Sequence, residues 1–171
     1  MKKIGIISDT HGLWDDRYAK HFMGCDEIWH AGDIGNEDVI DRLAQVAPVI
    51  HAVYGNVDGG MLRKRFHEVD CFTTEGVKVW MTHIGGYPGR YAMGVKAQLM
   101  REQPKLFISG HSHILKVVND RQLGLLHINP GAAGRQGWQT VRTLVLLTLD
   151  AGDIKDCEVV EMRDKMEPYI R

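Results

Sequence analysis

The sequence predicts an α/β protein in which two mixed β-sheets lie face to face and helices cover their outer faces. Two observations lead to this class. The N-terminal part alternates short apolar runs with helical patterns, which is the order of a parallel sheet with crossover helices. Later, apolar runs separated by turn signals predominate, which indicates a second, mixed sheet.

In the N-terminal part, three strands are expected to alternate with two helices. The strands are expected at residues 3–8, 27–30 and 48–54, and the helices at 16–23 and 37–46. In the second helix, apolar residues recur at helical spacing: Val39, Ile40, Leu43 and Val46. This β-α-β-α-β order favours a parallel sheet, because parallel neighbours need a crossover connection.

From residue 71 onward, strands predominate. Segments 71–74 and 77–82 flank Glu75-Gly76, which predicts a hairpin. A helix is expected at 91–102, ended by Pro104, and the segment 84–90 before it is expected to be a loop at the mouth of a site. Further strands are expected at 105–109, 115–119, 125–128, 141–149 and 154–162. Arg142 and Thr143 are expected where their strand meets solvent.

Length and composition predict one domain that spans residues 1–171. Hydrophobic residues make up 44% of the chain and charged residues 25%, close to globular averages, which argues against disorder. The 21 basic and 22 acidic residues leave a net charge of −1. This balance argues against broad, charge-driven binding to nucleic acid or to an anionic membrane.

Cysteine usage and the N-terminus favour a cytoplasmic protein. Cys25, Cys71 and Cys157 have no metal or redox spacing, so we expect buried free thiols rather than a disulfide framework. The apolar run after Lys2-Lys3 stops at Asp9, too early for a secretion signal. No stretch approaches the ~20 apolar residues that a membrane helix needs.

Seven polar side chains follow the ends of predicted strands. Ligands of open α/β sheets bind outside the carboxyl ends of the strands, so these groups are expected to converge on one crevice. They are Asp9, His11, Asp33, Asn56, His83, His111 and His113. Their mixed oxygen and nitrogen donors suit manganese, iron, cobalt, nickel or zinc rather than calcium. One ion takes about four to six ligands, so seven predict two ions that share a bridge.

Glycines and structural alternatives bear on this site. Gly32, Gly55 and Gly110 each precede a candidate ligand, where glycine permits a sharp turn and a close approach of the backbone. Taken singly, Asp9 or Asp33 could be a helix N-cap, and Asn56 a turn residue. These alternatives would have to hold in every segment at once, which favours the metal pair. His30 is expected either to support Asp33 or to be a satisfied buried histidine.

The same residues resemble the calcineurin-like metallophosphoesterase superfamily. The matching pieces occur in the family's order: Asp9-Thr10-His11, Gly32-Asp33, Gly55-Asn56-Val57-Asp58, Thr82-His83 and Gly110-His111-Ser112-His113. Asn129-Pro130-Gly131-Ala132 is similar to the Asn-Pro-Gly-Ser signature of the small, cap-less bacterial and archaeal phosphodiesterase branch. The resemblance implies a four-layer α/β/β/α sandwich and in-line attack of metal-activated water on phosphorus.

The resemblance also implies roles for the site residues. Asp9, His11 and His113 would hold one ion, Asn56, His83 and His111 would hold the other, and Asp33 would bridge both. Asn56 would be both catalytic and substrate-binding, with its amide oxygen on an ion and its NH₂ group on the phosphate.

Two departures from the family pattern follow. Many members have a histidine that protonates the leaving oxygen where this chain has Val57. Asp58 is a candidate for contact with the substrate and for that proton, and its alternative role is to orient the Asn56 loop. Close relatives often have a further histidine where this chain has Gly85. Arg90, in the same segment, is expected to meet a phosphate, with a solvated arginine as the alternative.

The leading hypothesis is a metal-dependent phosphoesterase, with a phosphodiesterase favoured over a monoesterase. Its cofactors would be two divalent ions, manganese first, with iron, zinc, nickel and cobalt as alternatives. Its partner would be a small phosphate ester, without strong nucleic-acid binding and without a membrane, and a homo-oligomer is left open. One alternative is a non-catalytic scaffold, because the same fold serves as an assembly subunit in the eukaryotic retromer coat. The other is a nuclease, against which the near-neutral charge counts.

Overall fold

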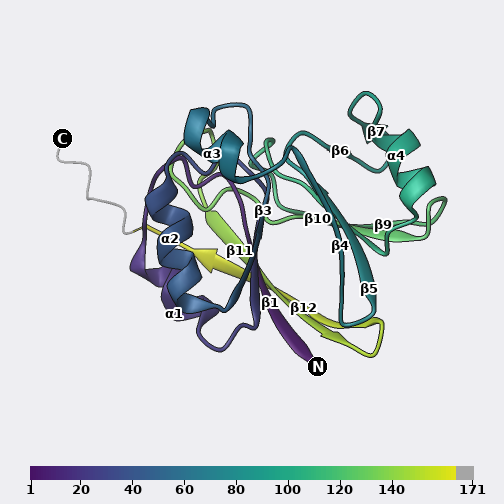
Figure 1. The fold of residues 1–171 in the computed structure, drawn as a ribbon, viewed down its shortest axis with the longest axis horizontal. Helices are drawn as coiled ribbons and strands as arrows, with labels where there is room; N and C mark the ends of the chain where they lie inside the picture. The colour runs from purple at the N-terminus through teal and green to yellow at the C-terminus, as the bar shows by residue number, and fades with distance from the viewer. Residues whose placement is uncertain (165–171) are drawn as a thin grey trace.

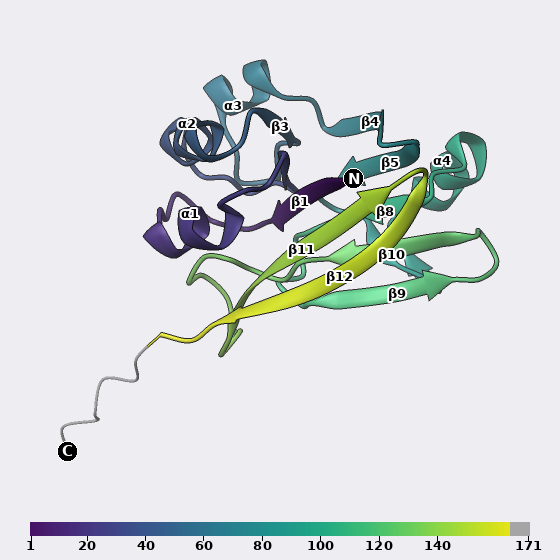
Figure 2. The ribbon, with the colours of Figure 1, turned by 90° about the horizontal axis from the view of Figure 1, so that it is seen from below.

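The computed structural model describes residues 1–164, which form two five-stranded sheets, a two-stranded ribbon and four helices (Figure 1). The first sheet has the order β12-β11-β1-β2-β3. Its strands are β1 (Lys2–Ile7), β2 (Glu27–His30), β3 (Val49–Ala52), β11 (Arg142–Asp150) and β12 (Asp153–Met162). The first three are parallel, whereas β11 and β12 form an antiparallel hairpin at one edge (Figure 2). The sheet is therefore mixed.

The second sheet has the order β4-β5-β8-β10-β9. Its strands are β4 (Val69–Thr74), β5 (Val77–Thr82), β8 (Leu106–Ile108), β9 (Lys116–Asp120) and β10 (Leu125–Asn129). The central three are parallel, and the two edge strands are antiparallel to their neighbours. The helices are α1 (Asp16–Phe22), α2 (Glu37–Val46), α3 (Gly60–Arg65) and α4 (Val95–Glu102).

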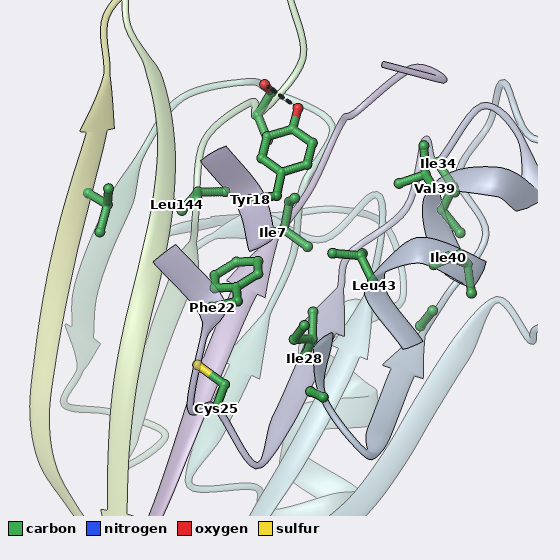
Figure 3. Packing of buried hydrophobic residues seen from close by; sticks show 14 of the residues in the cluster. Ile7, Tyr18, Phe22, Cys25, Ile28, Ile34, Val39, Ile40, Leu43 and Leu144 are labelled. Carbon is green, nitrogen blue, oxygen red and sulfur yellow. Dashed lines mark hydrogen bonds between the residues drawn. The ribbon is translucent and has the colours of Figure 1, made fainter. Parts of the chain in front are cut away.

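Three hydrophobic clusters mark the interfaces between four layers. The first joins α1 and α2 to the first sheet, with Phe22 and Leu43 packed near Ile28 (Figure 3). The second combines residues of both sheets, such as Ile6 and Val79. The third joins α4 to the second sheet. In Figure 1, α1 and α2 lie on one side of the sheets and α4 on the other. The predicted four-layer α/β/β/α sandwich is confirmed.

Two short elements differ from the sequence prediction. The segment expected to be a loop contains an antiparallel ribbon of β6 (Gly86–Tyr87) and β7 (Arg90–Tyr91). The chain reverses at Pro88-Gly89, so Tyr91 pairs with Gly86 and α4 begins only at Val95. Helix α3 was not expected, because only one of its six residues, Leu62, is buried and no apolar period announces it.

Some smaller expectations were also wrong. Arg142 and Thr143 are buried rather than at the solvent end of their strand. Arg142 donates to carboxylate oxygens of Asp15 and Asp164, each at 3.0 Å. The three cysteines are free, as expected, but Cys71 is exposed and Cys157 is only partly buried. No helix of the described residues is long and apolar enough to cross a bilayer.

Candidate metal centre

The seven candidate ligands meet where parallel strands of the two sheets end. The loops that follow β1, β2 and β3 supply Asp9, His11, Asp33 and Asn56. The loops after β5 and β8, in the facing sheet, supply His83, His111 and His113. Because the sheets pack face to face, strand ends that are distant in sequence share one edge of the sandwich.

These side chains form two groups. Ligand atoms of Asp9, His11 and His113 all lie within 4.8 Å of one another, and so do those of a second set: Asp33, His83 and His111. The Oδ1 atom of Asn56 lies 3.1 Å both from Nε2 of His83 and from Nδ1 of His111, so Asn56 joins the second group. Each group could hold one metal ion.

Asp33 lies between the two groups. Its Oδ2 atom is 3.2 Å from Nε2 of His83 in the second group and 3.7 Å from Nε2 of His11 in the first. A single carboxylate oxygen therefore faces imidazoles of both groups. Such a carboxylate can contact two cations at once.

Asp9 has one carboxylate oxygen held by hydrogen bonds and one that has no hydrogen-bond partner. The hydroxyl of Ser8 and the backbone N–H of His111 donate to Oδ2, at 2.6 and 3.1 Å. The Oδ1 atom is buried without a hydrogen bond. It faces Nε2 of His113 at 3.2 Å, of His11 at 3.8 Å and of His83 at 3.9 Å. A buried carboxylate oxygen without a partner is costly, and a cation would satisfy it.

Asp33 is oriented in the same manner. The backbone N–H of Val57 donates to its Oδ1 at 3.1 Å, which leaves Oδ2 toward the imidazoles. The loop can approach this closely because residue 55 is glycine: a Cβ there would lie 2.1 Å from Oδ1 of Asp33. The glycine that precedes Asn56 thus makes room for Asp33.

The second ring nitrogens of two histidines are tied to fixed acceptors. Nδ1 of His83 lies 2.7 Å from the carbonyl oxygen of Ala31, and Nδ1 of His113 lies 3.2 Å from Oε1 of Gln139. Both oxygens can only accept, so each Nδ1 donates its proton. Nε2 of each neutral ring, which faces the carboxylates, is then free to bind a metal.

Backbone strain is concentrated at the site. Eight non-glycine residues of the described chain have positive φ, a conformation that costs free energy for residues with a Cβ. Five of them are candidate ligands: Asp9, His11, Asp33, His111 and His113. Such residues persist only where the surrounding structure over-determines them, and they cluster at functional sites.

His30 is not a ligand in either group, but its hydrogen bonds hold the loops that carry the ligands. Its Nδ1 accepts from the backbone N–H of Gly32 at 3.1 Å, so its Nε2 donates to the hydroxyl of Thr10 at 3.0 Å. Burial lowers the pKa of His30 to about 4, which keeps the ring neutral. One side chain thereby connects the loop of Asp33 with the loop of Asp9 and His11.

The Asn129-Pro130-Gly131 segment fixes the loop that carries His111 and His113. The Nδ2 group of Asn129 donates to the carbonyl of Gly110 at 2.9 Å and to the hydroxyl of Ser112 at 3.1 Å. Its Oδ1 accepts from the backbone N–H of Gly131 at 3.0 Å. The Asn129 motif supplies no ligand atom to either group of candidate ligands, but it fixes the loop that positions the imidazoles of His111 and His113.

The electrostatic field of the site favours positive charge. Burial would raise the pKa of Asp33, but hydrogen bonding and charge from His83, with smaller contributions from Val57 and His11, lower it. Burial would lower the pKa of His83, but Asp33 and Asp9 raise it. The nearby carboxylate of Asp9 raises the pKa of His113. Carboxylates that favour protonated histidines would equally favour a metal cation.

Asp58 and Arg90 occupy different positions from the ligands. The Asp58 carboxylate is buried and accepts three backbone N–H groups, from Ile34, Gly35 and Gly55, at 2.8–3.1 Å. This supports the orienting role and leaves substrate contact by Asp58 without structural support. Arg90 is exposed and lines a hollow together with His111.

Sequence reasoning missed three supporting residues: Ser8, Thr10 and Gln139. The two hydroxyls flank Asp9 in sequence, which was a usable signal. Gln139 lies 26 residues from His113 in an irregular segment, and no pattern indicated it.

Comparison with known proteins identifies relatives in sequence. Residues 1–152 match the model of the calcineurin-like phosphoesterase superfamily domain. A probable metallophosphoesterase of Methanocaldococcus jannaschii is 31% identical over 138 residues, an alignment that covers 75% of this chain and 67% of that protein. A probable metallophosphoesterase of Methanothermobacter thermautotrophicus is 30% identical over 142 residues, covering 75% of this chain and 76% of that protein.

Solved structures with the same fold have lower identity. Vps29 of Chaetomium thermophilum superposes with a TM-score of 0.74 at 13% identity, covering 95% of this chain and 97% of that one. A novel archaeal phosphodiesterase superposes with a TM-score of 0.70 at 23% identity, covering 94% of this chain and 99% of that one. Vps29 of Entamoeba histolytica complexed with Zn²⁺ superposes with a TM-score of 0.68 at 19% identity, covering 93% of this chain and 98% of that one. At these identities the neighbours support the fold alone.

Proposed function

The protein belongs to the calcineurin-like phosphoesterase superfamily, and from that membership and its geometry we propose that it is a phosphodiesterase with a centre for two divalent cations. Membership of this family supports the assignment of the protein as a hydrolase of phosphate esters. The preference for diesters, the dinuclear centre and the role of each residue are our proposal.

The unpartnered Oδ1 atom of Asp9 carries this proposal. It is buried among three imidazole nitrogens at 3.2–3.9 Å, and nothing else in the described chain satisfies it. Asp9, His11 and His113 would hold one cation, and Asn56, His83 and His111 the other, with Asp33 in contact with both. Oxygen and nitrogen donors suit manganese first, and also iron, zinc, nickel or cobalt.

The bound cations would lower the pKa of a water molecule and offset charge on the phosphate oxygens. The residues of the chain position and orient the reacting groups. Hydrogen bonds from Ser8, the backbone of Val57 and the ring nitrogens hold carboxylates and imidazoles in fixed directions, so little reorganisation accompanies the reaction. Asn56, whose amide oxygen faces two imidazoles, is left with its NH₂ group to donate to a phosphate oxygen.

Two hollows beside the centre support a diester over a monoester. One, of about 220 Å³, is lined by Asn56 and His83 together with Tyr54 and Arg63. The other, of about 180 Å³, is lined by His111. A phosphodiester has two substituents on phosphorus, and each would find room in one of the two hollows. The archaeal phosphodiesterase among the structural neighbours also supports this preference.

The substrate proposed is a small phosphate ester in the cytoplasm. The net charge of −1 argues against a nuclease that binds extended nucleic acid. The Vps29 neighbours fit the alternative of a non-catalytic scaffold. The complete set of seven good donor side chains in this chain favours an enzyme.

The test is elemental analysis of the purified protein, combined with metal rescue after treatment with a chelator. Bis(p-nitrophenyl) phosphate and p-nitrophenyl phosphate serve as the diester and the monoester. We expect about two metal equivalents and a higher kcat/KM for the diester, lost in chelator and restored by Mn²⁺. Equal activity in chelator would refute the metal mechanism. Absence of turnover on both esters at full metal loading would favour the scaffold.

A further inference from the structure

A basic hollow adjoins the candidate metal centre on the side of His111. It has a volume of about 180 Å³, and its charged lining residues are Arg90 and Lys116. No aspartate or glutamate lines it. The hollow therefore offers two positive charges and no carboxylate to offset them.

Both cations lie beside Tyr87: Arg90 is its partner in the β6–β7 ribbon, and Lys116 approaches it from β9. Tyr87 and Arg90 are directly opposite each other in the ribbon, so their side chains share one face. The Nζ atom of Lys116 lies 4.0 Å from the centre of the Tyr87 ring, a cation–π contact that keeps the ammonium at the hollow. Tyr87 thus lies beside both Arg90 and Lys116.

Within residues 1–164, neither cation is neutralised by a carboxylate. Other lysines of the second sheet and its neighbouring loops are paired: Lys78 with Glu102 at 3.0 Å, and Lys105 with Asp153 at 2.7 Å. Arg90 and Lys116 have no such partner among the described residues. Unpaired cations beside a hollow leave charge available to a ligand.

The hollow is fixed relative to the metal centre. Lys116 is the register partner of Asn129 in the β9–β10 pair. Asn129 donates to Gly110 and Ser112, the residues on either side of His111. The strand that carries Lys116 is therefore tied to the loop that presents a candidate ligand.

The hollow lined by Asn56 and His83 has a different charge. Its lining includes one cation and one anion, Arg63 and Glu68. Nε of Arg63 donates to the backbone carbonyl of Asp58 at 2.6 Å, and its guanidinium lies 4.6 Å from the centre of the Tyr54 ring. The two hollows beside the centre thus differ: one is balanced in charge and the other is cationic.

We propose that the hollow formed by Tyr87, Arg90 and Lys116 binds a second phosphate group of the substrate. The preferred substrate is then a phosphodiester that also carries a phosphomonoester on the substituent beside His111. Two positive charges match a phosphomonoester dianion, and the guanidinium can donate to it through two N–H groups. This inference rests on the proposed function and specifies its substrate class.

The test compares two diesters that differ in one group: thymidine 5′-(p-nitrophenyl phosphate) and the same compound with a 3′-phosphate. Release of nitrophenolate reports diester cleavage in the Mn²⁺-loaded protein. We expect a lower KM for the 3′-phosphorylated diester. Lys116→Gln and Arg90→Gln should each raise that KM about tenfold more than the KM of the plain diester. Lys20→Gln, which removes an exposed charge on α1, should change neither.

A binding measurement without catalysis tests the proposed subsite independently of the hydrolysis reaction. Titration of chelator-treated protein with thymidine 3′,5′-bisphosphate should show about tenfold weaker affinity for the Lys116→Gln variant than for the wild type. If both diesters have the same KM in the wild type, or if the variants raise both equally, the subsite inference is overturned while hydrolysis stands. If neither diester is cleaved but the bisphosphate binding still depends on Lys116, the proposed function fails and the subsite remains.

Discussion

The Nδ1 atom of His113 lies 3.2 Å from the Oε1 atom of Gln139, whose amide group donates to the carbonyl of Gly134 at 3.2 Å. Gln139 therefore sets which ring nitrogen of His113 faces Asp9. Gln139→Ala should weaken metal binding about 10- to 100-fold, because the ring loses its fixed orientation and tautomer. A metal titration against a chelating dye measures this. Gln45→Ala, at an exposed position of α2, is the control, and equal affinities for the two variants would contradict the role.

Gly110→Ala should disturb the same carboxylate. A Cβ at residue 110 would lie 2.2 Å from the Ser8 hydroxyl oxygen and 2.9 Å from Oδ2 of Asp9, both in a buried region. We expect a loss of about 1–3 kcal/mol in the free energy of unfolding, together with weaker metal binding. Urea denaturation and metal titration check both. Gly60→Ala is the matched control, since open space surrounds that position, and a wild-type phenotype for Gly110→Ala would refute the close packing.

Asp33→Asn should abolish metal-dependent hydrolysis. The carboxylate oxygen that faces His83 and His11 is placed to contact two cations, whereas an amide is neutral. We expect kcat/KM on an aryl diester to fall at least about 100-fold, with a wild-type circular dichroism spectrum. Asp156→Asn, an exposed carboxylate on β12, should retain activity. Retained activity in Asp33→Asn would contradict the assignment.

Val57→His should improve cleavage of esters with poor leaving groups. The Val57 side chain is 52% exposed beside Asn56, and its backbone N–H, which holds Asp33, is unaffected by the substitution. A general acid contributes about 10²- to 10⁴-fold. We expect the rate on an alkyl diester to rise by up to about 100-fold, with little change on an aryl diester. An equal effect on both esters would show that the histidine does not act as an acid.

The Asp15–Arg142–Asp164 cluster should make stability fall in acid. The hydrogen bond from Arg17, with one from Arg142, holds the pKa of Asp15 well below its ordinary value. Arg135 and Arg17 lower the pKa of Asp164 to about 2. Below about pH 4 the unfolded chain binds protons that the folded chain does not, so stability falls as pH falls toward the folded-state pKa values.

The Asp15→Asn variant tests this cluster. The Asp15 side chain is 13% exposed and faces the buried Arg142, so we expect a loss of about 1–3 kcal/mol in the free energy of unfolding at pH 7. That difference from the wild type should shrink between about pH 4 and pH 2. Urea denaturation across this range measures it. Asp38→Asn, in an exposed pair with Arg42, should cost less than about 0.5 kcal/mol.

Strongly periodic elements could be predicted from the sequence. Strand β2 and helix α2 begin and end where the apolar pattern placed them, because all four residues of β2 are buried and α2 buries one apolar face against the first sheet. Helix α3 and the β6–β7 ribbon could not be predicted from the sequence, because few of their side chains are buried. Arg142 was misplaced for another reason: its burial depends on Asp15 and Asp164, which come from distant segments.

The sequence by itself determined the fold class, the family and the identity of seven candidate metal ligands, because residue type and position after a strand are local properties. Only the tertiary structure decided how those side chains are oriented. The surroundings of the free Oδ1 of Asp9, the tautomer imposed on His113 by Gln139, and the contact of Lys116 with Tyr87 each join segments far apart in the chain. Hydrogen bonds act over about 3 Å of space and carry no signature along the chain.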